Sequence, residues 1–277
     1  PPPRSTVSVL ETISSEAGRI ASRFAALRAE GRRALIPYLT AGYPAPAATP
    51  ELLERLVRAG ADVIELGVPF SDPLADGPTI QRASQRAIEN GATLRATLEL
   101  LSAFRARHET PVVLFTYLNP LLAYGVDRFI GDAVDAGADG VLLTDLPVGS
   151  DASLEEAFER SPLDLIRLIA PTTPPARARE IARRAQGFIY YISRTGVTGA
   201  TKALREGLAG EVAAIREAAR VPVAVGFGIS SPEQAAEAAA AADGIVVGSA
   251  LINALDREGP EGMESFLAGL RAALDRR

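Results

Sequence analysis

The chain has 277 residues, 47% of them hydrophobic and 23% charged, a composition that predicts a globular protein with a large core. The net charge of −5 and the lack of any basic stripe argue against nucleic acid as the main partner. With no cysteine, neither a disulfide framework nor a thiolate metal site can form. No apolar run approaches the roughly 18 residues of a membrane span, and residues 1–18 lack the apolar core of a secretory signal. We therefore expect a cytoplasmic protein with no membrane partner.

The chain begins with a segment that does not fit the pattern of the remainder. Residues 1–18 are predicted to be an N-terminal extension, for which disorder is one interpretation, and 19–277 a single domain, because no Pro/Gly/Ser linker divides them. In 18–31, Ile20, Phe24 and Leu27 recur at helical spacing and predict an extra N-terminal helix. That helix either plugs the bottom of the barrel that follows or is an ordinary packing helix, which is the commoner role.

Short apolar or β-branched runs then alternate with Ala-, Glu- and Arg-rich helical patterns. The runs predict eight strands, at 34–42, 62–68, 111–117, 139–145, 163–171, 187–193, 221–228 and 243–250. The helical patterns between them include 49–61, 154–161, 174–186 and 231–242. Continuous apolar strands alternating with helices indicate an α/β fold with a parallel sheet covered by helices. Eight such units favour closure into a (β/α)8 TIM barrel over an open doubly wound sheet.

A carboxylate interrupts the second predicted strand, in "DVIELGV". Glu65 either pairs outward with an Arg, is solvated at the strand end, or points into the barrel mouth as a general acid/base. Its apolar neighbours favour the third orientation, in which burial raises its pKa enough to hold and return a proton near neutral pH. Asp76 follows in the polar loop "SDPLADGP" and is expected to stay ionised. Asp72 and Asp76 are also typical turn formers, an interpretation that suits Asp72 better.

Three Gly-rich turns follow the last three strands, at 194–200, 226–232 and 248–255. Glycine lets backbone N–H groups approach a phosphate, and a helix N-terminus adds partial positive charge. One such turn is weak evidence, but three adjacent turns, two of them at a frequent phosphate site of this fold, favour a phosphorylated ligand. We expect Ser249 to cap the helix that it opens and to face the anion. The expected lining residues are Gly199, Phe227, Gly228, Gly248 and Ser249.

The scarce residue types disfavour two common routes to aldol cleavage. Lys202 lies in a predicted loop, whereas a Schiff-base Lys would be expected on a strand. With His108 as the only histidine, a metal site held by His is also disfavoured. A retro-aldol substrate would then have to carry its own electron sink, as an indole ring does. Protonation at C3 gives an iminium, and cleavage of the C–C bond returns the electrons, so a proton donor and an anion near the ring N–H would suffice.

The stretch "IELGVPFSDPLADGPTIQ" (64–81) resembles the signature of the tryptophan synthase alpha chain family. Similar stretches follow the family order at 36–44, 117–125, 142–148, 168–174, 190–200 and 226–234. The resemblance covers nearly all of the chain beyond residue 18. It implies a (β/α)8 barrel that cleaves indole-3-glycerol phosphate to indole and glyceraldehyde 3-phosphate, a lyase of tryptophan biosynthesis.

The resemblance also implies residue roles. Glu65 matches the acid/base that protonates indole C3 and accepts the glycerol hydroxyl proton, and Asp76 matches the carboxylate that stabilises charge at the indole N–H. Thr198 and Gly199 match a mobile loop after strand 6, in which Thr198 orients Asp76. The other implied site residues are Tyr190, Tyr38 and Tyr117 around the substrate, and Phe227, Gly228, Gly248 and Ser249 around the phosphate. Ordinary barrel packing is the alternative for Tyr38 and Tyr117.

The family implies a partner as well. Alpha chains bind beta chains that carry pyridoxal phosphate, as an alpha2beta2 heterotetramer in which indole passes from one chain to the other. No metal and no cofactor are expected in this chain, and the loops 72–76 and 194–199 would face the partner. Two alternatives stay open: another phosphate-binding barrel enzyme, such as a sugar-phosphate isomerase or epimerase, and a non-catalytic subunit that activates a beta-like partner. The presence of Glu65, Asp76 and the phosphate loops disfavours the second.

Overall fold

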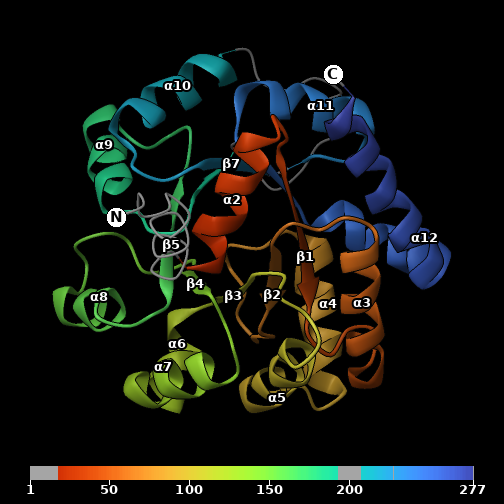
Figure 1. Ribbon diagram of the computed structural model, residues 1–277. Helices are drawn as coiled ribbons and strands as arrows, with labels where there is room; N and C mark the ends of the chain where they lie inside the picture. The colour runs from red at the N-terminus through yellow and green to blue at the C-terminus, as the bar shows by residue number, and fades with distance from the viewer. Residues whose placement is uncertain (1–17, 193–206, 227, 277) are drawn as a thin grey trace, which may run out of the picture.

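The computed structural model describes residues 18–192, 207–226 and 228–276, and within them eight parallel strands close into a barrel in chain order (Figure 1). The predicted TIM barrel is confirmed. Each strand lies inside its predicted segment and ends before the last predicted residue. The strands are β1 (Ala34–Thr40), β2 (Ile64–Gly67), β3 (Val112–Thr116), β4 (Gly140–Leu143), β5 (Asp164–Ile169), β6 (Ile189–Ile192), β7 (Val223–Gly226) and β8 (Gly244–Val247).

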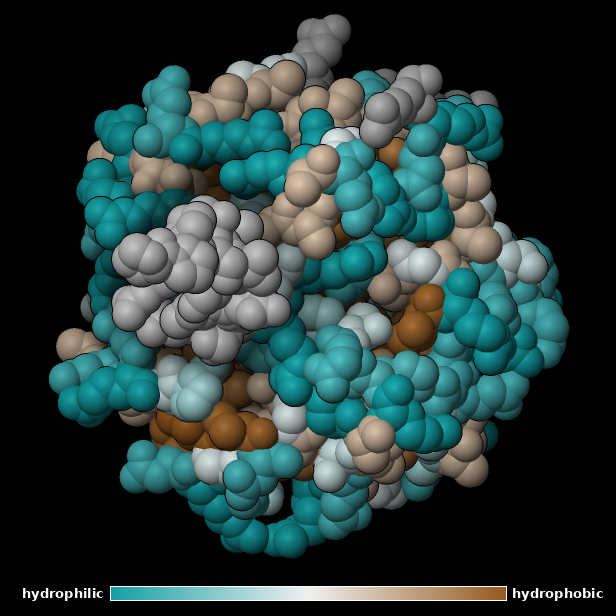
Figure 2. Space-filling model, viewed as in Figure 1, coloured by the Kyte–Doolittle hydropathy of each residue, from teal (hydrophilic) through white to brown (hydrophobic). Residues whose placement is uncertain are grey.

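Helices surround the barrel, and each predicted helix is present (Figure 1). After the short 3-10 turn η1 (Pro46–Ala48) they are α3 (Thr49–Arg58), α4 (Pro78–Glu89), α5 (Leu94–Arg105), α6 (Leu118–Tyr124), α7 (Val126–Asp135), α8 (Ala152–Glu159), α9 (Pro175–Arg184), α10 (Leu208–Ala218), α11 (Pro232–Ala241) and α12 (Ser249–Asp275). Hydrophilic residues predominate on the face shown in Figure 2. None of the described helices is both long and apolar enough to cross a bilayer.

The extra N-terminal helix, α2 (Arg19–Ala29), plugs the bottom of the barrel. Its residues Ile20, Phe24 and Leu27 are at most 4% exposed and pack in one cluster with inward-facing strand residues. The strand members of that cluster include Ala34, Ile36, Val113, Leu142, Ile166 and Val246. Phe24 also meets Phe188 with ring centroids 5.9 Å apart. The plug is therefore the correct one of the two predicted roles, because the apolar face of the helix fills the barrel end.

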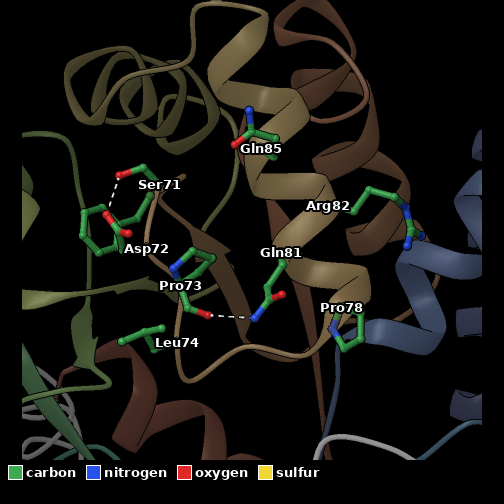
Figure 3. A pocket seen from close by; sticks show the side chains of 9 residues that line it. Ser71, Asp72, Pro73, Leu74, Pro78, Gln81, Arg82 and Gln85 are labelled. Carbon is green, nitrogen blue, oxygen red and sulfur yellow. Dashed lines mark hydrogen bonds between the residues drawn. The ribbon is translucent and has the colours of Figure 1, made fainter.

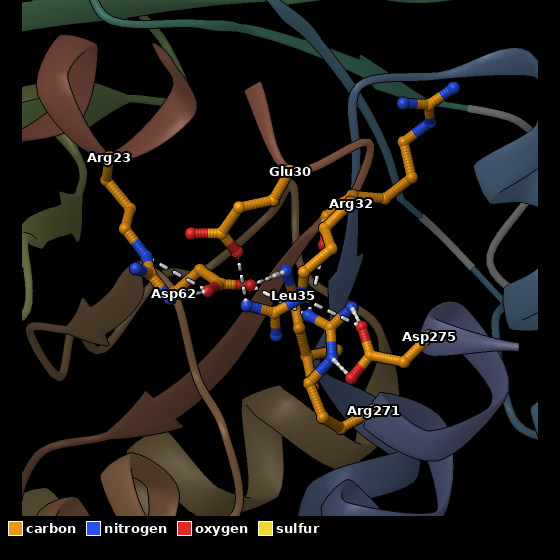
Figure 4. Close-up of polar contacts among 8 residues, drawn as sticks. Arg23, Glu30, Arg32, Leu35, Asp62, Arg271 and Asp275 are labelled. Carbon is orange, nitrogen blue, oxygen red and sulfur yellow. Dashed lines mark hydrogen bonds and ion pairs between the residues drawn. The ribbon is translucent and has the colours of Figure 1, made fainter. Parts of the chain in front are cut away.

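Three aspartates fasten the same end of the barrel. Asp62, just before β2, is 1% exposed and accepts hydrogen bonds from Leu35 N (2.8 Å), Arg23 Nε (3.0 Å) and Arg271 Nη1 (2.8 Å; Figure 4). It thus joins β1, α2 and α12 at one buried carboxylate. Buried charges of this kind are tolerated where cations and N–H groups surround them.

The same arrangement recurs before β4 and β8. Asp139 accepts from Val112 N at 2.8 Å and from Arg105 Nη2 at 2.8 Å. Asp243 accepts from Val223 N at 2.9 Å and pairs with Arg216 at 2.7 Å. Each aspartate satisfies a backbone N–H near the start of the preceding strand, so that adjacent strands are tied together at the N-terminal end of the barrel.

Candidate active site

Glu65 points into the barrel interior from β2. Its register partners are Tyr38 on β1 and Val113 on β3, and Val113 belongs to the interior cluster. The side chain is 1% exposed, and no described residue donates a hydrogen bond to its Oε1. Burial raises the pKa of Glu65 to about 8. The inward orientation is confirmed, and the outward Arg pair and the solvated strand end are both wrong.

Asp76 lies in the loop between β2 and α4 and is only 7% exposed. The Tyr117 hydroxyl donates a 2.8 Å hydrogen bond to its Oδ2. Burial raises the pKa of Asp76 to about 6, and the Tyr117 hydrogen bond opposes that rise. The loop around Asp76 is polar in sequence, but the carboxyl itself is buried beside Tyr117, which the sequence did not predict. A pKa near 6 still leaves the carboxylate ionised at neutral pH, as expected.

Asp72 differs from Asp76 in the same loop. It is exposed, its carboxylate accepts from Ser71 Oγ at 2.9 Å, and its carbonyl accepts from Leu74 N at 2.8 Å. These are the contacts of a turn-forming aspartate, as predicted.

Tyrosine side chains form the wall of the mouth. Tyr38 is 5% exposed, and its ring lies so close to Gly67 that a Cβ there would overlap the hydroxyl; Tyr190 covers Gly226 in the same way. Tyr38 also meets Phe115 edge-on, with ring centroids 5.3 Å apart. Desolvation, followed by the charges of nearby carboxylates, raises the pKa of both tyrosines well above the usual value. The two buried tyrosines therefore lie close to the acidic groups.

Gly248 brings a helix N-terminus to this wall. A Cβ on Gly248 would lie 3.6 Å from the Tyr38 Cβ, and α12 begins at the next residue. The first N–H groups of a helix have no carbonyl partner within the helix and favour an anion. Ser249 is exposed, but the N-cap residue is Gly248 and no side chain caps the helix, so the predicted capping role of Ser249 is wrong.

The structure thus brings together at the C-terminal end of the barrel most of the predicted residues that it describes. Glu65, Asp76, Tyr38, Tyr117 and Tyr190 line the mouth, and Gly228, Gly248 and Ser249 follow β7 and β8. Thr198, Gly199 and Phe227 lie outside the described residues. Within the described ranges, no three His, Asp or Glu side chains gather as a metal site would require.

Two residues near the mouth escaped the sequence analysis. Phe115 meets Tyr38 edge-on, and Asp145 contacts the start of α6, where its Oδ1 accepts from Leu118 N at 2.7 Å. The available signal for Asp145 was its place as the last residue of the predicted strand 139–145, at the barrel end where such enzymes carry their functional groups.

A hollow of about 500 Å³ lies on the outer side of the loop that carries Asp76 (Figure 3). The loop supplies one side and α4 the other, with Gln81, Arg82 and Gln85 on the helix. Leu74 stands at its edge and is 90% exposed.

The model of the family described as "Tryptophan synthase alpha chain" matches residues 24–273. The chain belongs to this family. It is 49% identical over 260 residues to the tryptophan synthase alpha chain of Geobacter sulfurreducens (92% of this chain, 98% of that one). It is 51% identical over 257 residues to that of Citrifermentans bemidjiense (92% and 96%).

Solved structures agree with these sequence relatives. A Mycobacterium tuberculosis tryptophan synthase structure matches with a TM-score of 0.88 at 39% identity, covering 95% of this chain and 100% of the other. The alpha subunit from Legionella pneumophila str. Paris matches with a TM-score of 0.84 at 39% identity, covering 94% and 99%. The resemblance seen in the sequence is confirmed. As a tryptophan synthase alpha chain, the protein is a lyase that cleaves indole-3-glycerol phosphate to indole and glyceraldehyde 3-phosphate.

Proposed function

We propose that Glu65 is the acid/base and Asp76 the charge-stabilising carboxylate of this cleavage. The observation that carries the proposal is the contrast between two buried carboxyls at one mouth: Glu65 with its pKa near 8 and Asp76 with its pKa near 6. At pH 7 the first holds a proton and the second does not. Two carboxyls with separated pKa values are suited to divide acid and anion roles.

The chemistry then needs only these two groups. Glu65 gives its proton to C3 of the indole, and the ring nitrogen takes the positive charge, which the Asp76 carboxylate stabilises at the N–H. The Glu65 carboxylate then removes the proton from the hydroxyl on the carbon joined to C3. The C–C bond breaks, its electrons return to the indole, and an aldehyde forms. Glu65 ends protonated, ready for the next turnover.

Substrate binding follows from the remaining mouth residues. We assign Tyr38 and Tyr190 to the walls against the indole ring, and Tyr117 to holding Asp76. The phosphate is assigned to the N-terminus of α12, with Gly248 and Ser249 closest and Gly228 beside them. Gly248 lies next to Tyr38, which supports binding of an aromatic ring and an anionic tail at once. Thr198, Gly199 and Phe227 stay predictions.

The outer hollow is assigned to the partner. An exposed Leu74 beside a concave surface suits burial against another protein. We propose that this face docks a tryptophan synthase beta chain that carries pyridoxal phosphate, in an alpha2beta2 heterotetramer of the cytoplasm. No cofactor is assigned to this chain. We assign 19–277 to one barrel domain and 1–18 to an extension.

An indole-release assay tests the proposed function. The full chain is supplied with indole-3-glycerol phosphate, alone and then with a beta chain. We expect release in both cases and more of it with the partner. If indole formed in neither, the chain would be a non-catalytic subunit; if the Asp76→Asn variant released indole at the unaltered rate, Asp76 would have no catalytic role.

A further inference from the structure

We propose that Asp145 is a positioning residue for the cleavage, and that it holds Tyr117 against Asp76 through the start of α6. The proposal rests on the role proposed for Asp76. Asp145 itself is exposed at the end of β4, and its hydrogen bond among the described residues runs to Leu118 N, not to a mouth side chain. It acts through the backbone of the neighbouring strand.

The first contact is between Asp145 and the N-terminus of α6. Asp145 Oδ1 accepts a 2.7 Å hydrogen bond from the N–H of Leu118, the first residue of the helix. Tyr117 occupies the N-cap position, and its own side chain does not cap the helix. A carboxylate from the next strand thus supplies the acceptor and the negative charge that a helix N-terminus favours.

The second contact runs from Tyr117 to the site. Its hydroxyl donates to Asp76 Oδ2 at 2.8 Å and accepts from Ala75 N at 3.0 Å, so that it grips both the carboxylate and the loop behind it. The ring is 5% exposed and lies against Phe70, with centroids 5.2 Å apart. Because the position of this ring depends on the backbone at 117–118, fixing Leu118 N fixes the hydroxyl.

The ends of β3 and β4 are also connected through Thr144. Thr144 N donates to Thr116 O at 3.1 Å, and the Thr144 side chain interacts with the Tyr117 hydroxyl. Asp145 therefore lies one residue beyond the last backbone link between the two strands. Its hydrogen bond to Leu118 N extends the connection between the two strands to the start of α6.

The expected consequence concerns the charge state of Asp76 as well as its position. The Tyr117 hydrogen bond lowers the pKa of Asp76 against the rise that burial causes. The other groups whose pKa reflects the Asp76 charge are Tyr38 and Tyr190, which share the mouth with Glu65. Those tyrosines stay neutral at working pH. Loosening Tyr117 would let the pKa of Asp76 rise further, and the acid side of the pH–rate profile would move with it.

The test compares Asp145→Ala and Asp145→Asn with a matched control. Asp151 is also an exposed aspartate on the segment between β4 and α8, and it also caps a helix, accepting from Leu154 N at 3.0 Å. Indole release by the full chain is measured against pH for Asp145→Ala, Asp145→Asn, Asp151→Ala and Asp76→Asn. Thermal unfolding of each variant is recorded as well.

We expect Asp145→Ala to lower kcat about tenfold with a smaller change in KM, and to move the acid limb of kcat/KM upward by about half a pH unit. Asp145→Asn should keep much of the unaltered kcat and of the unaltered acid limb, since its amide oxygen still accepts from Leu118 N. Asp151→Ala should change neither kcat nor the acid limb. A profile for Asp145→Ala and Asp145→Asn that overlays the unaltered chain, or an equal shift in Asp151→Ala, would overturn the proposal. Full activity in Asp76→Asn would instead remove the role of Asp76 itself.

Discussion

Buried carboxylates have different surroundings at the two ends of the barrel. At the N-terminal end, Asp62 and Asp139 are each held by two arginines and a backbone N–H. At the C-terminal end, Glu65 and Asp76 are as deeply buried, but no salt bridge reaches either from the described residues. Glu65 Oε1 has no described donor, and the described side chain that bonds Asp76 is the neutral Tyr117.

The difference separates structure from chemistry. A carboxylate surrounded by cations keeps its charge and ties elements together, but it cannot exchange a proton near neutral pH. A carboxyl left to burial alone has a raised pKa and can do so. Cation pairing thus separates Asp62 and Asp139, which tie elements together, from Glu65 and Asp76, the two carboxyls proposed to act in the cleavage.

The largest effect is expected for Glu65→Gln. The amide keeps the size of the side chain but cannot donate a proton to C3, so cleavage should fall by about 10²–10⁴-fold. Because a pKa near 8 leaves Glu65 neutral at pH 7, the substitution should leave the unfolding temperature almost unaltered. Indole release and thermal unfolding measure the two quantities. A large loss of stability would place Glu65 with the structural acids.

Asp62→Ala should instead lower the stability of the protein. It leaves Arg23 and Arg271 without their buried partner and Leu35 N without an acceptor, at a cost of about 3–5 kcal/mol in the free energy of unfolding. Asp275→Ala is the matched control, since Asp275 pairs with Arg271 in the same cluster from a side chain that is 38% exposed. It should cost less than about 1 kcal/mol. Equal losses in urea unfolding would show that burial does not decide the strength of these pairs.

The pH profile of kcat/KM should be bell-shaped. Cleavage needs Asp76 ionised, which fails as pH drops through about 6, and Glu65 protonated, which fails as pH rises through about 8. Activity should therefore be highest near pH 7 and fall about tenfold per unit outside those limits. Asp76→Asn should lose the acid limb, whereas a profile flat from pH 5 to 9 would contradict both assignments.

How far the sequence predicted this arrangement depends on the range of the interaction. The barrel, its strands and the inward Glu65 follow from local apolar periodicity and from one polar residue inside an apolar run. The burial of Asp76 did not follow, because it depends on where the loop folds and on a tyrosine 41 positions along the chain. The helix-capping role of Ser249 failed for a smaller reason: the helix begins one residue earlier, with Gly248 as the N-cap.

The N-terminal end shows the same limit. Ile20, Phe24 and Leu27 predicted an amphipathic helix, but only the closed barrel provides the opening that it fills. Asp62 and Asp139 were invisible as structural acids, since their arginines come from distant parts of the chain. An apolar run around a carboxylate, as around Glu65, indicates that it will be buried. It does not reveal which cation will meet it.

Asp164 departs from the other acids at the N-terminal end of the barrel, because no described cation pairs with its carboxylate. It is the first residue of β5, and no described residue forms a hydrogen bond or salt bridge with its carboxylate. Burial first, and then the charge of Asp139, raise its pKa from 3.8 to about 6. The unfolded chain therefore loses this proton at a lower pH than the folded chain. Stability that is full below about pH 4 must fall as pH rises toward 6, and it stays low above that.

Asp164→Asn removes the titrating group and should stabilise the protein at pH 7 by about 1–2 kcal/mol, a value reduced from the full shift because the side chain is partly exposed. The gain should disappear below about pH 4, where the unaltered carboxyl is protonated in both states. Urea unfolding at pH 4 and pH 7 measures it, with activity expected to stay the same because Asp164 is far from the mouth. A variant less stable at pH 7 would mean that the carboxylate gains more from its surroundings than burial costs it. Asp164 would then be a structural carboxylate without a paired cation, and cation pairing would not separate the structural carboxylates from Glu65 and Asp76.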